Sequence, residues 1–280
     1  MASHKRSHEA SAVVTGAGSG IGRAFALELA KRGGQVVAAD IDPDAAAETV
    51  SQIEATGGRA LAVVTDVSRE TSVRELADAA TSWFGLPSLV INNAGIGTGG
   101  GLIGDGKLRA WRRAIDVNLW GVIYGADVFT PLLRQGGRGG IINTASAAGF
   151  AAAPGMAPYN VSKAGVITLS ETLAAELQRT SITVTVLCPT FVPTNIFDGE
   201  LIDAASAAKG KRLAEKSKLT AEDIAIKTLD AHDRGRLYVL PQLDAKIVWR
   251  AKRLLPVAYM KAAGRMIKTS ATGTASHAVR

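Results

Sequence analysis

The chain has 280 residues, of which 47% are apolar, so it is long enough to bury one sizeable core. Its single cysteine excludes an internal disulfide, and its four histidines have no partner at metal-ligand spacing. Residues 1–10 are polar without a secretory signal, and no apolar run approaches membrane-spanning length. We therefore expect a cytoplasmic protein without a metal site: a flexible segment over 1–10, one domain over 11–240 and an extension over 241–280.

The first predicted unit is a strand, a tight turn and a helix. Residues 11–15 form a short β-branched run, and residues 21–30 have helical periodicity. Between and beside them, Gly16, Gly20 and Gly22 allow a sharp turn that approaches a pyrophosphate, which the unpaired N–H groups of a helix start would bind. The spacing Gly-x-x-x-Gly-x-Gly departs from the usual dinucleotide fingerprint, so the turn alone is not specific.

A second strand, over residues 35–39, ends at Asp40. An acidic residue at this place hydrogen-bonds the adenosine ribose in dinucleotide-binding folds. Asp40 and Asp42 would repel a 2′-phosphate, and the next basic residue is Arg59, so we expect NAD in preference to NADP. Arg23, from the first helix, could reach this area, so NADP is disfavoured but not excluded. A capping role for Asp40 is the alternative, although Asp42 is better placed to cap the following helix.

Further strand-like runs follow at residues 60–64, 89–91, 141–143 and 182–187, separated by helix-length segments. This alternation predicts an α/β fold with a parallel sheet and helices on both faces. Cys188 ends the last of these runs, and we expect it to be a small buried apolar group.

Tyr159 and Lys163 are one helical turn apart, on the same helix face. Lowering a tyrosine pKa from about 10 to about 7 takes roughly 4 kcal/mol. One positive charge at about 4 Å supplies a similar amount at an effective dielectric of about 20. We therefore expect Lys163 to lower the pKa of Tyr159, with further help from oxidised nicotinamide. Taken alone, the pair also suits an ordinary amphipathic helix.

The motifs of residues 10–240, in order and spacing, resemble those of the short-chain dehydrogenase/reductase family. They are Thr15 to Gly22, Asp66 with Val67, Asn92 to Gly95, Asn118, Ser146, Tyr159-x-x-x-Lys163 and Pro189 to Thr194. The resemblance implies a single-domain, Rossmann-type doubly wound sheet, with residues 235–240 near its last strand. Where the family often has Pro-Gly, this chain has Pro189-Thr190, which we expect to alter the backbone there without changing the cofactor.

The resemblance also implies a dinucleotide site. The side chain of Asp66 and the backbone of Val67 would hold the adenine, while the segment 92–95 lines the groove and ties down the central strand. Residues after Pro189 would accept the nicotinamide amide, with Thr194 near the phosphates. The expected cofactor-binding residues are Gly16, Ser19, Gly20, Ile21, Gly22, Asp40, Ile41, Asp66, Val67, Asn92, Ala94, Gly95, Tyr159, Lys163, Pro189, Val192 and Thr194.

Four residues form the expected catalytic set. Tyr159 would exchange a proton with the alcohol or ketone while hydride passes to or from the nicotinamide ring. Ser146 would donate a hydrogen bond to the reacting oxygen, and Lys163 would also grip the nicotinamide ribose. Asn118 would bend its helix and anchor a water that links Lys163 to solvent. Singly, Ser146 suits a strand-end cap and Asn118 an ordinary helix residue, but their order in the chain favours catalysis.

These residues predict an NAD(P)-dependent oxidoreductase that interconverts a secondary alcohol and a ketone. Phe150 and Met156 beside the catalytic turn, and Phe197 in an expected lid over 194–220, favour an apolar or aromatic substrate. A pliable glycine loop over 95–101 would border the same pocket. The alternatives are a non-catalytic nucleotide-sensing regulator on the same fold and a peripheral membrane reductase of lipid-like substrates.

The resemblance implies a homodimer or homotetramer, paired through helices over 108–133 and 159–177. The formal charge of the chain is +7, and residues 242–268 carry seven basic residues against Asp244, which gives +6. Apolar residues alternate with these charges, so we expect a basic amphipathic helix, broken near Pro256. It would pack on the domain or a second subunit, in preference to binding a membrane or an acidic substrate. Without a recognition motif, nucleic-acid binding is not expected.

Overall fold

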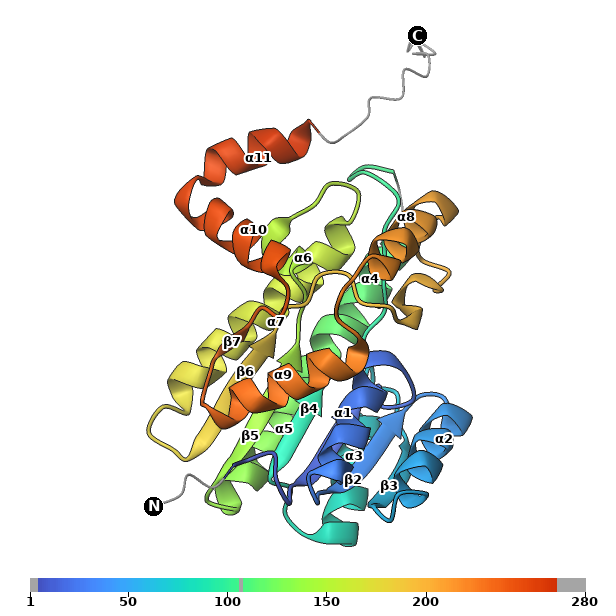
Figure 1. The fold of residues 1–280 in the computed structure, drawn as a ribbon, viewed down its shortest axis with the longest axis vertical. Helices are drawn as coiled ribbons and strands as arrows, with labels where there is room; N and C mark the ends of the chain where they lie inside the picture. Colours follow the sequence, from blue (N-terminus) through green and yellow to red (C-terminus); the bar gives the residue numbers. More distant parts are fainter. Residues whose placement is uncertain (1–4, 106–107, 266–280) are drawn as a thin grey trace.

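Seven parallel strands form one sheet in the order β3-β2-β1-β4-β5-β6-β7 in the computed structural model, which describes residues 5–105 and 108–265 (Figure 1). The chain order therefore reverses between β1 and β4, which is where doubly wound folds bind nucleotides. The strands are β1 (Ser11–Thr15), β2 (Gln35–Asp40), β3 (Arg59–Val64), β4 (Leu89–Asn92), β5 (Gly139–Thr144), β6 (Ile182–Leu187) and β7 (Tyr238–Val239).

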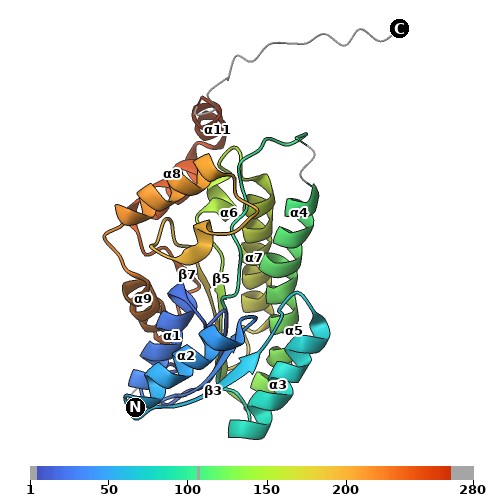
Figure 2. The same ribbon diagram turned by 90° about the vertical axis from the view of Figure 1, so that its right-hand side faces the viewer.

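The central strands are buried on both faces, because helices cover the sheet on either side (Figure 2). One core cluster packs α1, α2 and α9 on Ala12 and Val14 of β1, and the other packs α3, α5 and α7 on Val13. This arrangement confirms the predicted doubly wound fold, and continuous apolar runs such as 11–15 and 182–187 predicted their strands correctly.

The helices follow the strands in alternation. They are α1 (Gly20–Lys31), α2 (Pro43–Glu54), α3 (Glu70–Phe84), α4 (Leu108–Ile115), the π-helical turn η1 (Asp116–Trp120), α5 (Gly121–Gln135), α6 (Ala148–Ala151), α7 (Ala157–Glu176), the 3₁₀ turn η2 (Asn195–Phe197), α8 (Ala204–Glu215), α9 (Ala221–Asp233), α10 (Leu243–Leu254) and α11 (Pro256–Gly264). None of the helices in the described residues is long and apolar enough to cross a membrane.

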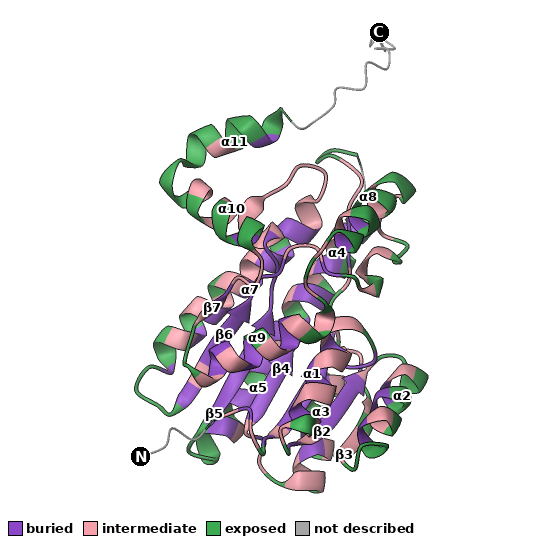
Figure 3. Ribbon diagram, viewed as in Figure 1, coloured by how far each residue is buried: buried purple, intermediate pink, exposed green. Residues whose placement is uncertain are grey.

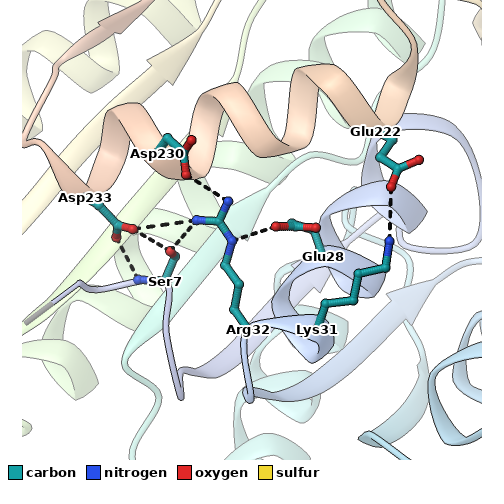
Figure 4. A network of polar contacts seen from close by, with 7 residues as sticks. All are labelled: Ser7, Glu28, Lys31, Arg32, Glu222, Asp230 and Asp233. Atoms are coloured by element: carbon teal, nitrogen blue, oxygen red, sulfur yellow. Dashed lines mark hydrogen bonds and ion pairs between the residues drawn. The ribbon is translucent and has the colours of Figure 1, made fainter. Parts of the chain in front are cut away.

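The segment before β1 is more firmly held than its polar sequence suggests. Ser7 is fully buried, and its N–H and hydroxyl donate to Asp233 at 2.8 and 2.7 Å. Arg32 donates to Ser7, Glu28 and Asp230, and so links α1 to α9 (Figure 4). The expected flexible segment over 1–10 therefore does not extend to Ser7, because buried polar groups anchor that residue; residues 1–4 lie outside the described residues.

Helices α10 and α11 extend from the body at the end of the sheet that carries α6 and α8 (Figures 1 and 3). Pro256 begins α11 directly after the end of α10, which confirms the predicted break. The remainder of the basic extension, including Lys268, lies outside the described residues.

Candidate active site

The glycine turn between β1 and α1 depends on the absence of side chains. Gly16 and Gly20 have φ values of 65° and 51°, in the left-handed region that favours glycine. A Cβ on Gly22 would lie 1.9 Å from the carbonyl oxygen of Gly16, and a Cβ on Gly16 would lie 2.7 Å from Cα of Ala94. The turn is therefore packed directly against β4 and against the first turn of α1, which leaves the backbone close to any group above it.

The start of α1 is available for an anion. Ser19 is the N-cap residue, and its side chain makes no capping hydrogen bond, so Ile21 and its neighbours keep unpaired N–H groups. A Cβ on Gly20 would lie 2.9 Å from Cγ2 of Thr194. The structure thus brings Thr194, which is far along the chain, to the helix start where the sequence predicts phosphates.

Asp40 lies at the end of β2, beside the glycine turn. Its Oδ2 accepts a hydrogen bond of 2.8 Å from the N–H of Gly18, and its Oδ1 accepts one of 3.1 Å from the N–H of Asp42. Asp42 caps α2 by accepting from two N–H groups of its first turn, which confirms the predicted cap. Arg23 bonds Thr49 and the backbone carbonyls of Gly18 and Ala45, so it does not stand free to bind a 2′-phosphate.

Ile41 follows Asp40 and is 57% exposed. Its position at the carboxyl edge of the sheet, beside the turn that Asp40 orients, leaves it open to a bound nucleotide.

Asp66 and Val67 follow β3 on the other side of the groove. Partial burial acts to raise the pKa of Asp66, but hydrogen bonds from Ser68 and the charges of Arg113 and Arg69 outweigh it, so the pKa is lowered. The carboxylate therefore stays ionised and can accept a hydrogen bond. Val67 is buried against α5, where a Cβ on Gly121 would lie 2.9 Å from its Cγ2.

The end of β4 contains two neighbouring asparagines with different roles. The buried Asn92 donates to Oδ1 of Asn143 at 2.9 Å, so it ties the central strand to β5. Asn93, which the sequence reasoning did not single out, donates to the carbonyl oxygens of Thr15 and Gly16. The hydroxyl of Thr15 in turn accepts from the N–H groups of Asn93 and Ala94. Thr15 and Asn93 belong to two motifs that each end a strand at the same edge of the sheet, and this position could have indicated Asn93.

Asn118 lies in the π-helical turn between α4 and α5, as the predicted local bend required. Its Oδ1 accepts from the N–H of Ile96 at 2.7 Å, and its Nδ2 donates to the carbonyl oxygen of Ile96 at 2.9 Å. A Cβ on Gly95 would lie 3.1 Å from Oδ1 of Asn118 and 3.3 Å from Nζ of Lys163. Asn118, Gly95 and Lys163 therefore meet at one point, and the absence of a side chain at 95 makes this possible.

Tyr159, Ser146 and Lys163 come together at the start of α7, and all three are buried. Nζ of Lys163 donates to the carbonyl oxygen of Thr144 at 2.8 Å and lies 5.9 Å from the centre of the Tyr159 ring. Burial lowers the pKa of Lys163 to about 8, so the ammonium form still predominates at neutral pH.

The pKa of Tyr159 differs from the sequence-based expectation. Burial raises it to about 12, and a hydrogen bond with Ser146 only partly offsets this. The expected lowering by Lys163 is therefore wrong for this structure, because desolvation of the phenolate has the largest effect on the pKa, and Nζ of Lys163 is directed at the carbonyl oxygen of Thr144. The protonated phenol is the form that the buried site favours.

The loop after β6 carries Pro189 to Thr194. The carbonyl oxygen of Pro189 accepts from the N–H of Ala147, and Val192 is buried in the core beneath it. Thr190 has no positive φ. Its N–H donates to Oε1 of Gln242 at 3.1 Å and its hydroxyl donates to Oδ1 of Asp244 at 3.2 Å, so it ties this loop to the start of α10.

The glycine loop after β4 is held on two sides. The N–H of Gly99 donates to the carbonyl oxygen of Leu201, between η2 and α8, and the N–H of Gly100 donates to that of Gly155 before α7. A cavity of about 400 Å³ opens between this loop, the start of α4 and the turn before Tyr159. Its lining includes Gly155, Pro158 and apolar side chains, namely Leu102, Ile103, Leu108 and Trp111.

The groove has the features that a dinucleotide requires. A close-packed glycine turn meets an uncapped helix start, Asp40 lies at the end of β2, and a buried tyrosine and lysine lie across the sheet edge from them. The residues present therefore fit a nicotinamide dinucleotide.

Known proteins share this arrangement. A family model described as short chain dehydrogenase matches residues 10–203. The "Probable oxidoreductase EphD" of Mycobacterium tuberculosis is 40% identical over 184 residues, covering 65% of this chain but 31% of that relative, so the chain spans less than a third of its length. The 1-deoxy-11-beta-hydroxypentalenate dehydrogenase of Streptomyces exfoliatus is 35% identical over 255 residues, covering 88% of this chain and 90% of that protein.

A solved structure is similar over nearly its whole length. It is a short chain dehydrogenase/reductase from Burkholderia phymatum in complex with NAD, with a TM-score of 0.82 and 38% identity. The match covers 87% of this chain and 92% of that chain.

Proposed function

Because the chain belongs to the short-chain dehydrogenase family, we propose that it interconverts a secondary alcohol and a ketone with NAD, using Tyr159 as general acid and base. The observation that carries the proposal is the meeting of buried Tyr159, Ser146 and Lys163 beside Asn118 and Gly95. Lysine is rarely buried in proteins, so an ordinary amphipathic helix is not expected to bury a lysine and a tyrosine together at a sheet edge.

Bound NAD would accept hydride from the alcohol carbon, or NADH would return it to the ketone. In reduction, the phenol of Tyr159 gives its proton to the carbonyl oxygen; in oxidation, the phenolate takes the hydroxyl proton. Ser146 donates to the same oxygen and stabilises its developing charge. Lys163 would hold the ribose, and the positive charge of the oxidised nicotinamide would oppose the desolvation that raises the pKa of Tyr159. Asn118 holds the backbone at Ile96 and so fixes the wall beside Lys163.

The remaining cofactor contacts follow from position. Asp40 would receive the adenosine ribose hydroxyls, and its charge opposes a 2′-phosphate, so NAD is preferred over NADP. Asp66 and Val67 would hold the adenine, Thr194 and the start of α1 the pyrophosphate, and the loop after Pro189 the nicotinamide amide.

The substrate would be apolar and of moderate size. The cavity beside the turn before Tyr159 is lined largely by apolar side chains, including Leu102, Ile103 and Trp111. Apolar walls favour the transfer of an apolar body from water, while the only reacting polar group lies at Ser146 and Tyr159.

The first test measures turnover. Purified protein is incubated with NAD and a panel of apolar secondary alcohols, or with NADH and the matching ketones, and absorbance of the reduced nicotinamide is followed. We expect Tyr159→Phe to lower kcat by about 10²–10⁴-fold, with NAD binding retained by fluorescence titration. Tyr124→Phe, on α5, is the matched control and should keep its activity. Binding of NAD without turnover across the panel would instead favour the nucleotide-sensing regulator.

A second test measures cofactor choice. Asp40→Ala removes the acceptor of the Gly18 N–H and the charge facing the ribose, so we expect the preference for NAD over NADP to narrow by about tenfold. Asp44→Ala removes an equal charge from the first turn of α2 and serves as control. An unchanged ratio of the two kcat/KM values in Asp40→Ala would remove that residue from the proposal.

We also propose a homodimer or homotetramer that pairs through α4, α5 and α7. Leu108, Trp120 and Val161 are large apolar residues on these helices and the π-helical turn, and their side chains are 64%, 44% and 48% exposed. Sedimentation equilibrium tests this assembly, and a monomer at working concentration would contradict it.

A further inference from the structure

The last described helices, α10 and α11, together with residues 241 and 242 before them and Arg265 after them, form a C-terminal arm. Its inner side packs on the body. Ala245 is fully buried, and the Trp249 ring meets the Tyr238 ring of β7 with centroids 5.9 Å apart. The hydroxyl of Tyr259 donates to the carbonyl oxygen of Ala151 at 2.9 Å. The arm is therefore held in place on β7 and α6.

The outer side of the arm is apolar, which is the reverse of an ordinary surface helix. Leu243, Ile247 and Leu254 follow one another at spacings of four and seven residues, so they share one face of α10. Their exposed fractions are 71%, 58% and 78%. Leu255, Val257 and Met260 continue the exposed apolar surface into α11. Six of the 13 exposed large apolar side chains in the described residues thus lie within 18 residues of chain.

The charge of the arm is predominantly basic. The arm contains six basic residues against Asp244, which is the last acidic residue of the chain. Arg250 lies on the same face as the three apolar residues of α10, the exposed Lys261 lies in α11, and the exposed Arg265 directly follows α11. No ion pair joins an arm lysine or arginine to a carboxylate in the part of the chain that the structure describes.

The exposed apolar residues and the basic charge of the arm together favour an anionic lipid surface over a second copy of the chain. A second copy that used the same patch would place basic residues against basic residues, because a two-fold interface pairs a surface with itself. An anionic lipid surface offers the opposite charge and an apolar layer directly beneath it. We propose that the outer face of the C-terminal arm docks on anionic phospholipid bilayers, with Leu254, Leu255, Val257 and Met260 entering the acyl boundary.

The arm lies close to the end of the sheet that carries Ser146 and Tyr159, so docking of the arm would orient that end towards the bilayer. Thr190, in the loop after β6, bonds Gln242 and Asp244 at the base of the arm, and Ala151, which accepts from Tyr259, ends the helix that follows Ser146. A bilayer that holds the arm therefore lies near the end of the sheet that carries Ser146 and Tyr159. This inference goes beyond the proposed reaction, since binding to vesicles requires neither NAD nor a substrate.

Vesicle sedimentation of the full chain tests the proposal. We expect the protein to pellet with vesicles of phosphatidylcholine and phosphatidylserine, to stay in the supernatant with phosphatidylcholine alone, and to be released by salt. The double variant Leu254→Ser/Val257→Ser should weaken the partitioning by more than about tenfold, because two exposed apolar side chains are lost. Arg250→Gln/Arg265→Gln should weaken it as well and reduce its dependence on salt.

Matched variants distinguish the arm from the rest of the surface. Val64→Ser changes a residue of β3 that is 62% exposed, against 67% for Val257, and it should leave vesicle binding unchanged. Arg134→Gln, on α5, is the charge control. Failure to pellet with the anionic vesicles, or pelleting that the arm variants leave intact, overturns the proposal. Self-association without vesicles that Leu254→Ser/Val257→Ser abolishes would assign the face to a second copy and also overturn it.

Discussion

The body of the molecule and its C-terminal arm use apolar residues in opposite ways. In the body, Leu29 and Phe129 are fully buried, and Arg32 is surrounded by carboxylates, as Figure 4 shows. In the arm, Leu254 is 78% exposed and the basic residues have no carboxylate partner among the described residues. The apolar side chains of the arm are thus still exposed to water, and their burial against a partner would be favourable. An amphipathic sequence alone therefore does not reveal which side of a helix packs on the body.

One substitution applied in both regions gives the sharpest contrast. Leu29→Ala opens a cavity in the hydrophobic core between α1 and the sheet and should lower the free energy of unfolding by about 2–5 kcal/mol. Leu254→Ala removes a side chain that touches mainly water and should change it by less than about 0.5 kcal/mol. Urea denaturation followed by circular dichroism measures both. Equal losses would show that the arm is packed as firmly as the body.

The carboxylates around Arg32 give the next largest effect. Arg32→Met leaves Glu28 and Asp233, whose side chains are 13% and 7% exposed, without their cation. We expect the free energy of unfolding to fall by about 3 kcal/mol, since uncompensated buried charge is left behind. Arg74→Met is the control: its ion pair with Glu70 is about half exposed on both sides, so the loss should stay under about 1 kcal/mol.

His232 should make the body sensitive to acid. Burial lowers its pKa to about 4, partly opposed by Asp233, and its Nδ1 lies 2.8 Å from the hydroxyl of Thr185. Below pH 6.5 the unfolded chain binds a proton that the folded chain refuses, so stability contributed by neutral His232 is lost as the pH falls towards 4.

The expected loss from this group is up to about 3 kcal/mol. Denaturant midpoints of the wild type and His232→Gln, measured across this range, should converge as the pH falls. Parallel profiles would show that another group causes the acid sensitivity.

The sequence predicted features whose cause is local. Buried parallel strands are continuous β-branched runs, so β1 and β6 were placed correctly. The cap at Asp42 and the break at Pro256 follow from backbone chemistry at single residues. The fold followed from the alternation of these elements.

Features that depend on burial and distant contacts could not be predicted in this way. The raised pKa of Tyr159 results from desolvation in the folded chain, whereas the prediction from sequence considered the charges of Lys163 and of oxidised nicotinamide and no desolvation. Asn93 was passed over because its role depends on the glycine turn about 80 residues earlier, which only the fold brings to it. The outward orientation of Leu243 and Ile247 depends on which side of α10 carries Trp249 and meets β7.

The two hydrogen bonds of Thr190 join the loop after β6 to the start of α10 and so act as a latch. A glycine there would have neither a hydroxyl to bond Asp244 nor a restricted backbone. Because of this latch, α10 cannot tilt away from the body unless the latch breaks or the loop swings with it. Binding or release of a cofactor at the loop after β6 would therefore be coupled to movement of the arm.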